Sequence, residues 1–235
     1  MSNAERFIEI YNQVDQFLNE NVNADGHENF RHKVKKCDNP IIKKHKEKLY
    51  DYADLRNVLV YKTRYEDKII AEPLPDVVDD FHEILQTLIA PKKVFPLFSS
   101  TVIGAKLSDK LDEILRIMRT NSFSQIPIFN EQQTIVEVIN TNTISRWIGS
   151  QIEGECIITE NPCVDELIGE IEYKNNYKFV SRNSDIYTAF DCFIDHIVKE
   201  ERNLDALFIT ENGDKSEKPL GIITIEDIAK EVHNS

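Results

Sequence analysis

An internal repeat constrains the fold of this 235-residue chain more than any other feature. From about residue 95 onward, one order of patterns occurs twice, and such self-similarity indicates a duplicated structural unit. In the first copy, Leu111–Met118 has apolar residues at helical spacing, and two short apolar runs follow at Ile126–Phe129 and Ile135–Ile139. Asn140 and Thr143 then open another helical stretch. The pattern predicts a helix, two strands and a second helix.

The second copy follows the same order. Two predicted strands, Leu204–Ile209 and Leu220–Ile223, flank a turn marked by Asn212 and Gly213. The predicted helix before them carries apolar residues at positions i, i+4, i+7 and i+11, namely Ile186, Phe190, Phe193 and Ile197. A first short strand is predicted at Thr101–Ala105 in one copy and at Tyr177–Ser181 in the other. Each copy is therefore expected to be a strand–helix–strand–strand–helix unit.

A hydroxyl and a carboxylate stand near the end of the second copy. Thr224 follows an apolar run at once, and Asp227 comes three residues later, where we expect it to be the N-cap of the last helix. A hydroxyl and a carboxylate at this spacing, on a strand-to-helix turn, can chelate vicinal hydroxyls such as those of a ribose. The alternative is that both residues only cap the helix.

The repeat resembles a known family. Ser124–Ile128 in the first copy and Gly221–Ile228 in the second are similar to the corresponding parts of a tandem pair of CBS domains, named after cystathionine β-synthase. The resemblance implies an α+β fold in which two β-α-β-β-α units pack as a pseudo-symmetric pair. We expect an N-terminal α-helical domain over residues 1–92, a first CBS domain over 93–152 and a second over 153–235.

The resemblance also implies a ligand site between the two units. In the family, this cleft often holds AMP, ADP, ATP or S-adenosylmethionine. Thr224 and Asp227 would bind the ribose hydroxyls, and the carboxylate would make charge-assisted hydrogen bonds. Adenine would lie against Val102, Ile103 and Gly104, since a glycine lets the chain approach a flat ring. The phosphate end would face the segment made of Ser124, Gln125, Ile126 and Pro127.

Recognition of the phosphates is the part of this site that the sequence explains least. Ser124 and Gln125 are neutral, whereas phosphate sites normally use Lys or Arg. Either a basic residue reaches the site from elsewhere, with Arg116, Arg119 and Arg182 as candidates, or the ligand carries little negative charge.

The second cleft departs from the pattern of the family. Asn140 stands at the position of Thr224, and Thr143 at that of Asp227, so the carboxylate is missing. The opposite wall would consist of Tyr177, Lys178, Phe179, Leu204 and Asp205. Because an Asp repels phosphates, we expect this cleft to be empty or to hold something other than a nucleotide.

The N-terminal third shows helical periodicity only and predicts three or four helices. Asp76, after a Pro-Leu-Pro segment, is expected to cap one of them. Arg56, Asn57 and Tyr61 are similar to the Arg-Asn-x-x-x-His signature of the "higher eukaryotes and prokaryotes nucleotide-binding" domains, some of which are ribonucleases. Tyrosine, with a reference pKa near 10, is a poor base at neutral pH. The alternative is that Arg56 and Asn57 make structural hydrogen bonds.

Charge and composition limit the classes of partner and site. Arg31–Lys48 is locally basic and indicates either a solvated helix face or contact with RNA or an acidic partner. The net charge of −13 argues against nucleic acid as the main partner. Cysteines without C-x-x-C spacing and scattered histidines predict neither a metal site nor a redox pair. We expect core thiols at Cys163 and Cys192, and surface or boundary positions for His82 and His196.

The resemblance to a CBS pair implies a regulatory protein that is not an enzyme and that senses an adenosine-containing ligand. It also implies a homodimer, and we expect the helical domain to contact a protein target or a second copy of the chain. No apolar stretch reaches the length of a membrane span and no N-terminal signal pattern appears, so we expect the cytoplasm and no membrane. Two alternatives remain: a ribonuclease-like helical domain gated by the CBS pair, and a ligand-free dimerisation module.

Overall fold

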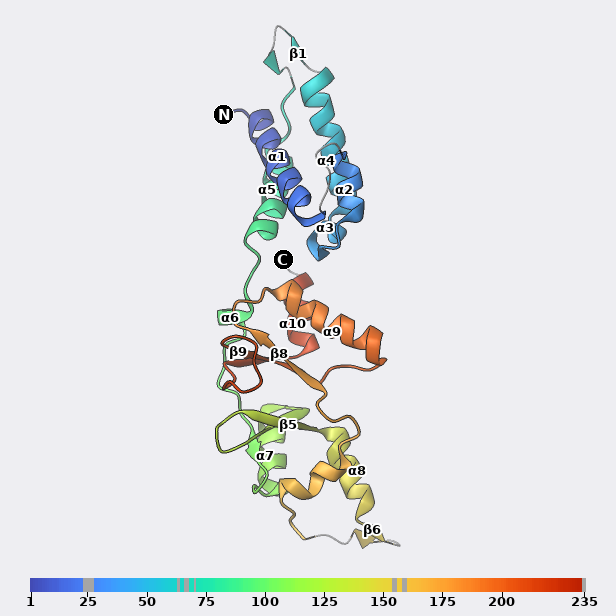
Figure 1. Ribbon diagram of the computed structural model, residues 1–235, viewed down its shortest axis with the longest axis vertical. Coiled ribbons are helices and arrows are strands. Elements are labelled where there is room, and N and C mark those ends of the chain that lie inside the picture. The colour runs from blue at the N-terminus through green and yellow to red at the C-terminus, as the bar shows by residue number, and fades with distance from the viewer. Residues whose placement is uncertain are drawn as a thin grey trace. The chain divides into compact units, whose positions relative to one another are not determined.

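The chain folds into two compact units, Met1–Lys92 and Lys93–Ser235. The computed structural model describes residues 1–22, 28–62, 64–65, 68–69, 71–153, 156–157 and 160–233. The first unit is mainly helical, and the second combines helices with two three-stranded sheets (Figure 1). The predicted α+β class is therefore confirmed.

The first unit contains helices joined by short connections. Their bounds are α1 Asn3–Val22, α2 Phe30–Lys36, α3 Pro40–Lys44, α4 Lys46–Asn57, the π-helical turn η1 Val58–Lys62 and α5 Pro75–Ile89. A hairpin of β1 Arg64–Tyr65 and β2 Lys68–Ile69, which the helical periodicity did not predict, separates α4 from α5. Leu74 is the N-cap of α5 and Asp76 lies in its first turn, so Asp76 is not the predicted cap.

Aromatic residues form the centre of the first unit. The ring of Phe81 lies 5.1 Å from that of Phe7 and 4.5 Å from that of Tyr52, measured between centroids. The Tyr52 hydroxyl and the Lys48 ammonium both donate hydrogen bonds to the carboxylate of Asp80. This carboxylate therefore ties α4 to α5 beside the aromatic centre.

The second unit follows the predicted repeat. In the first half the elements are α6 Val94–Leu97, β3 Ala105–Lys106, α7 Leu111–Asn121, β4 Gln125–Phe129, β5 Ile135–Asn140 and α8 Thr141–Ser150. The connection contains β6 Ile152–Glu153, β7 Cys156–Ile157 and the 3₁₀ helix η2 Val164–Glu170. In the second half they are β8 Tyr177–Ser181, α9 Ile186–Glu200, β9 Ala206–Thr210, β10 Gly221–Ile223 and α10 Ile225–His233.

The two sheets have the same topology. Their orders are β3-β4-β5 and β8-β9-β10, and in each sheet the first pair is parallel and the second antiparallel. The corresponding helices α7 and α9 also end alike, on left-handed residues Ser122 (φ 57°) and Glu201 (φ 54°). The internal repeat is thus confirmed. Its first strand is shorter than predicted in the first copy, since β3 is Ala105–Lys106 instead of Thr101–Ala105.

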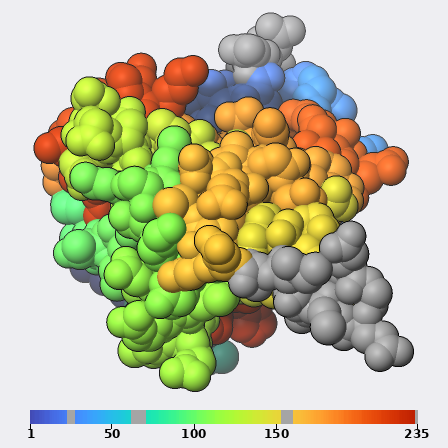
Figure 2. Space-filling view, turned by 90° about the horizontal axis from the view of Figure 1, so that it is seen from below, coloured from blue at the N-terminus to red at the C-terminus, as the bar shows by residue number. Residues whose placement is uncertain are grey.

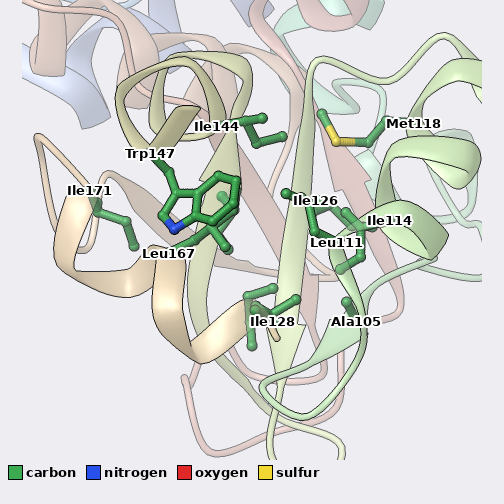
Figure 3. Close-up of a cluster of buried hydrophobic side chains, with 12 residues drawn as sticks. Ala105, Leu111, Ile114, Met118, Ile126, Ile128, Ile144, Trp147, Leu167 and Ile171 are labelled. Atoms are coloured by element: carbon green, nitrogen blue, oxygen red, sulfur yellow. The ribbon is translucent and has the colours of Figure 1, made fainter. Parts of the chain in front are cut away.

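The connection between the halves completes the core of the first half. Val164, Leu167 and Ile171 are buried with the side chains of α7, α8 and the first sheet (Figure 3). The N–H of Val164 donates to the carbonyl of Asp109 over 3.0 Å. Figure 2 shows the outer face of the first half, where the orange segment of the connection lies against the green α7 region. The domain boundary at 152 stays a prediction, and this core extends past it.

The segment before β3 belongs to the first half in sequence but packs against the second half. The N–H of Val94 donates to the carbonyl of Ser184 over 2.9 Å, and the N–H of Ser100 donates to that of Leu220 over 3.2 Å. The segment that precedes the first sheet therefore packs with the second half, and the connection that precedes the second sheet packs with the first half.

Apolar side chains join the two sheets. The buried cluster between them consists of Ile135, Val138, Ala206 and Phe208, with Val102, Phe129, Tyr177, Phe179 and Ile222 packed against it. Burial of this apolar surface stabilises the pair and fixes the sheets face to face. The two predicted clefts lie beside this contact. At each of them, the chain enters the first strand of one sheet and leaves the last strand of the other sheet.

Candidate ligand-binding cleft

A cavity of about 580 Å³ lies between the two halves of the second unit. First-half residues come from the segment before β3, the end of α7, the turn after it and β4, and second-half residues from β10 and the start of α10. The lining consists of Ser100, Thr101, Ile103, Asn121, Ser122, Phe123, Ser124, Gln125, Pro127, Ile222, Thr224, Glu226 and Asp227. Residues predicted for both the ribose end and the opposite wall therefore face one space.

Thr224 and Asp227 bond to each other at the start of α10. The Thr224 hydroxyl donates to Asp227 Oδ2 over 2.7 Å, and the Thr224 N–H donates to the same oxygen over 3.2 Å. The Asp227 N–H lies 3.4 Å from the Thr224 hydroxyl oxygen and donates to it. This is a capping box, in which Thr224 is the N-cap and Asp227 the third helical residue. The prediction that Asp227 is the N-cap is therefore wrong.

Capping leaves part of this pair for a ligand. Both bonds from Thr224 use Oδ2 of Asp227, and among the described residues no hydrogen bond reaches Oδ1. The carboxylate is exposed and lines the cavity. Since a carboxylate oxygen accepts hydrogen bonds from hydroxyl groups, the same residue can hold the helix end and bind a diol.

The side-chain amide of Gln125 ties the wall opposite Thr224 to the second half. The Ser124 hydroxyl donates to Gln125 Oε1 over 2.9 Å, and Gln125 Nε2 donates to the Asp205 carbonyl over 2.7 Å. Gln125 therefore bridges the halves at the edge of the cavity and has one amide hydrogen and part of its oxygen left for a ligand.

Other predicted site residues are placed elsewhere. Ile126 has no exposed surface and lies in the core of the first half. Val102 lines a neighbouring cavity of about 590 Å³, which shares Ser100 and Thr101 with the first. A Cβ on Gly104 would lie 2.2 Å from the Phe129 ring and 2.5 Å from the Pro127 carbonyl oxygen, so glycine is needed here for packing within its own half.

Sequence reasoning missed the end of α7 and the residue next to Asp227. The left-handed Ser122 turns the chain so that Asn121, Ser122 and Phe123 line the cavity. The sequence feature that could have identified this end of the cavity is an apolar residue, Phe123, just after the helical stripe. Phe123 is 39% exposed in the structure. Glu226 lines the cavity from the first turn of α10.

The lining carries negative charge only. Glu226 and Asp227 supply carboxylates, and no Lys or Arg occurs among the described lining residues. Of the candidate arginines, Arg116 lies 3.7 Å from Asp112 and Arg182 lies 3.0 Å from Glu211. Arg119 lines a separate cavity between α7 and α8.

A direct hydrogen bond crosses the second cleft. Asn140 is the N-cap of α8 and accepts from the Thr143 N–H over 2.9 Å. Its Nδ2 donates to the Asp205 carboxylate, 3.3 Å and 3.4 Å from the two oxygens. Burial raises the pKa of Asp205. The residues at the ribose position and on the facing wall thus bond to each other, although the expected vacancy of this cleft stays a prediction.

A buried histidine lies next to this bridge. His196 is 7% exposed, so its predicted surface or boundary position is wrong. Its Nε2 lies 2.9 Å from Asn176 Oδ1, and the N–H of Asp205 donates to the carbonyl of Asn176 over 2.9 Å. Burial lowers the pKa of His196.

The basic segment of the first unit is largely neutralised. Carboxylates from distant parts of the sequence and from neighbouring turns pair with it at Arg31–Asp54, Lys33–Asp15, Lys36–Glu28, Lys43–Asp38 and Lys48–Asp80. These ion pairs agree with a structural role for Arg31–Lys48.

The Arg56 guanidinium lies over the rings of Tyr11 and Tyr61, 5.5 Å and 5.4 Å from their centroids.

Cysteine placement differs from the prediction. Cys37 is buried, whereas Cys163 and Cys192 are only half-buried, so they are not core thiols. Cys163 lies near Asp165 and Glu166, and the Cys163 N–H donates to Glu166 Oε1 over 3.0 Å. This bond explains the cluster as a capping arrangement at the start of η2.

Within the residues that are described, no helix combines the length and the apolar composition that a membrane span requires. The model of the CBS domain family matches residues 168–234. A search of curated protein sequences gave no significant match.

Several solved structures are similar to the chain. The CBS domain pair of protein MJ0100 in complex with 5′-methylthioadenosine and S-adenosyl-L-methionine is 17% identical, has a TM-score of 0.44 and matches 61% of this chain and 98% of its own. The CBS domain of a bacterial CNNM/CorC family Mg²⁺ transporter in complex with ATP is 16% identical, has a TM-score of 0.43 and matches 68% of this chain and 99% of its own. The CBS domains of a transcriptional regulator from Streptococcus pneumoniae are 14% identical, have a TM-score of 0.38 and match 55% of this chain and 87% of their own.

Proposed function

From the premise that residues 168–234 form a CBS domain and that a unit of the same topology precedes it, we propose that the protein is a regulator. It binds an adenosine-containing ligand in the cleft between the two halves. The candidates are AMP, ADP, ATP and S-adenosylmethionine. Thr224 and Asp227 bind the ribose, while Ile103, Phe123 and Pro127 provide apolar surface for the base.

One observation carries the proposal: the Thr224–Asp227 pair faces a cavity that residues of the other half enclose. The volume of about 580 Å³ is within the usual range of small-molecule sites. Ile103 and Phe123 offer exposed apolar surface, and Asp227 Oδ1 offers an acceptor for a ribose hydroxyl. Such a mixture of apolar walls and few polar groups suits a nucleoside.

Regulation requires that the ligand binds two conformations unequally. A ligand in this cleft contacts both halves, so binding favours the relative placement of the halves that closes around it. The helical unit or a separate protein target responds to that change. We place the protein in the cytoplasm, and its function is not catalytic.

The proposal includes a homodimer. Exposed apolar side chains lie on α7 and α9 of the second unit, at Leu115, Ile194, Ile197 and Val198, with Val198 the most exposed at 73%. A second copy of the chain that covers these helices removes this surface from water.

A thermal-shift panel on the full chain tests the ligand class. Adenosine, AMP, ATP and S-adenosylmethionine are added separately, and a ligand present at about 100 times its dissociation constant stabilises the folded state by about 2.7 kcal/mol. Mass spectrometry of small molecules released from the purified protein is expected to find an adenosine derivative. If no compound of the panel shifts the transition, the pair is a ligand-free dimerisation module instead.

A further inference from the structure

The charge of the cleft restricts the kind of adenosine derivative that fits it. Nucleotide sites normally place Lys or Arg beside the phosphates. Here the ribose pair includes the carboxylate of Asp227, and Glu226 adds a second carboxylate from the same turn of α10. The facing wall offers the neutral groups of Asn121, Ser124 and Gln125. A 5′ phosphate is a few bonds from the ribose, so it would lie close to both carboxylates.

A basic side chain lines the neighbouring cavity and not this one. Lys218 precedes β10 and lines the adjoining cavity, whereas Thr224 follows the strand and lines the cavity together with Asp227.

We infer that the cleft selects adenosine derivatives whose 5′ substituent is uncharged or positively charged, and that Glu226 is a specificity-determining residue that disfavours phosphates. This inference rests on the proposed function. Two like charges about 6 Å apart in water change an affinity by a factor of about three, and an AMP phosphate meets two carboxylates here. A sulfonium substituent is instead attracted by both.

Titration calorimetry on the full chain tests the inference with adenosine, S-adenosylmethionine and AMP. In the parent protein at low salt, adenosine and S-adenosylmethionine are expected to bind at least about tenfold more tightly than AMP. Glu226→Gln is expected to narrow that ratio by about threefold, and 0.5 M NaCl is expected to narrow it in the parent because salt screens the exposed carboxylates.

Glu131→Gln is the matched control. Glu131 is exposed in the turn between β4 and β5 and does not line the cavity, so this variant removes the same charge from another place and should keep the parent ratio. If AMP binds the parent as tightly as adenosine, the inference is wrong while the proposed function stands. If both variants give the same ratio, Glu226 has no such role. Failure of all three compounds to bind rejects the proposed function itself.

Discussion

The Thr224 hydroxyl donates a 2.7 Å hydrogen bond to the carboxylate of Asp227, and this one pair both caps the start of α10 and faces the cavity of about 580 Å³ between the two halves. The two readings of the motif, a helix cap and a diol clamp, are therefore compatible. The capping bonds use one carboxylate oxygen, and the other is available to a ligand.

The capping role predicts a loss of stability without any ligand. Thr224→Ala removes the hydroxyl of the N-cap, so we expect the free energy of unfolding to fall by about 1 kcal/mol. Thr224→Ser keeps the hydroxyl and should stay close to the parent. Urea denaturation followed by circular dichroism measures both. Equal losses in the two variants would show that the methyl group, and not the cap, is what matters.

The bridge across the second cleft predicts a structural effect that leaves the first cleft intact. Asn140→Ala removes the N-cap of α8 and the bond to Asp205, and we expect a loss of about 1–2 kcal/mol of unfolding free energy. Affinity for adenosine should be unchanged. A large fall in adenosine affinity would indicate that the ligand lies at Asn140 instead.

Burial of His196 predicts a pH dependence of stability. Because burial lowers the pKa of His196, the unfolded chain binds a proton more readily, and stability is lost as pH falls below about 6.5, the reference value of histidine. His196→Gln should lose less stability than the parent between pH 7.5 and pH 5.5. His82→Gln, on the half-buried His82 of α5, serves as the control. Identical pH profiles for the parent and His196→Gln contradict this assignment.

The dimer proposal predicts a surface-specific effect. Val198→Asp places a charge on the exposed apolar face of α9 and should convert a dimer into a monomer in multi-angle light scattering. Val136→Asp, at a 39% exposed position on β5, is the control and should leave the mass unchanged. A parent protein that is monomeric at all concentrations removes the basis for this interface.

The repeat made most of the second unit predictable. Helical and strand periods alternate clearly in 111–139 and 186–223, and α7, β4, β5, α9, β9 and β10 lie where these patterns put them. The segment before β3 was harder to predict because Thr101–Ile103 is apolar in part yet lies outside the sheet and lines two cavities. The hairpin in the first unit consists of two-residue strands, which are too short to show a period.

Site geometry was less predictable than the fold. Thr224, Asp227, Ser124 and Gln125 meet at one cavity because two similar halves face each other, which the repeat implied. The placement of Phe123 depends on the left-handed backbone of Ser122, a conformation that no local sequence signal marks. Partners of the basic segment come from α1, α4 and α5, so its neutralisation follows from tertiary packing and not from composition.

The most direct test of the account is calorimetric titration of adenosine into the full chain and into Asp227→Asn. The amide keeps the shape of the side chain and removes its charge, so the account predicts a loss of about 1–3 kcal/mol of binding free energy for the variant. Asn140→Ala should bind like the parent. Equal adenosine affinity for the parent and Asp227→Asn would contradict the claim that this carboxylate holds the ribose.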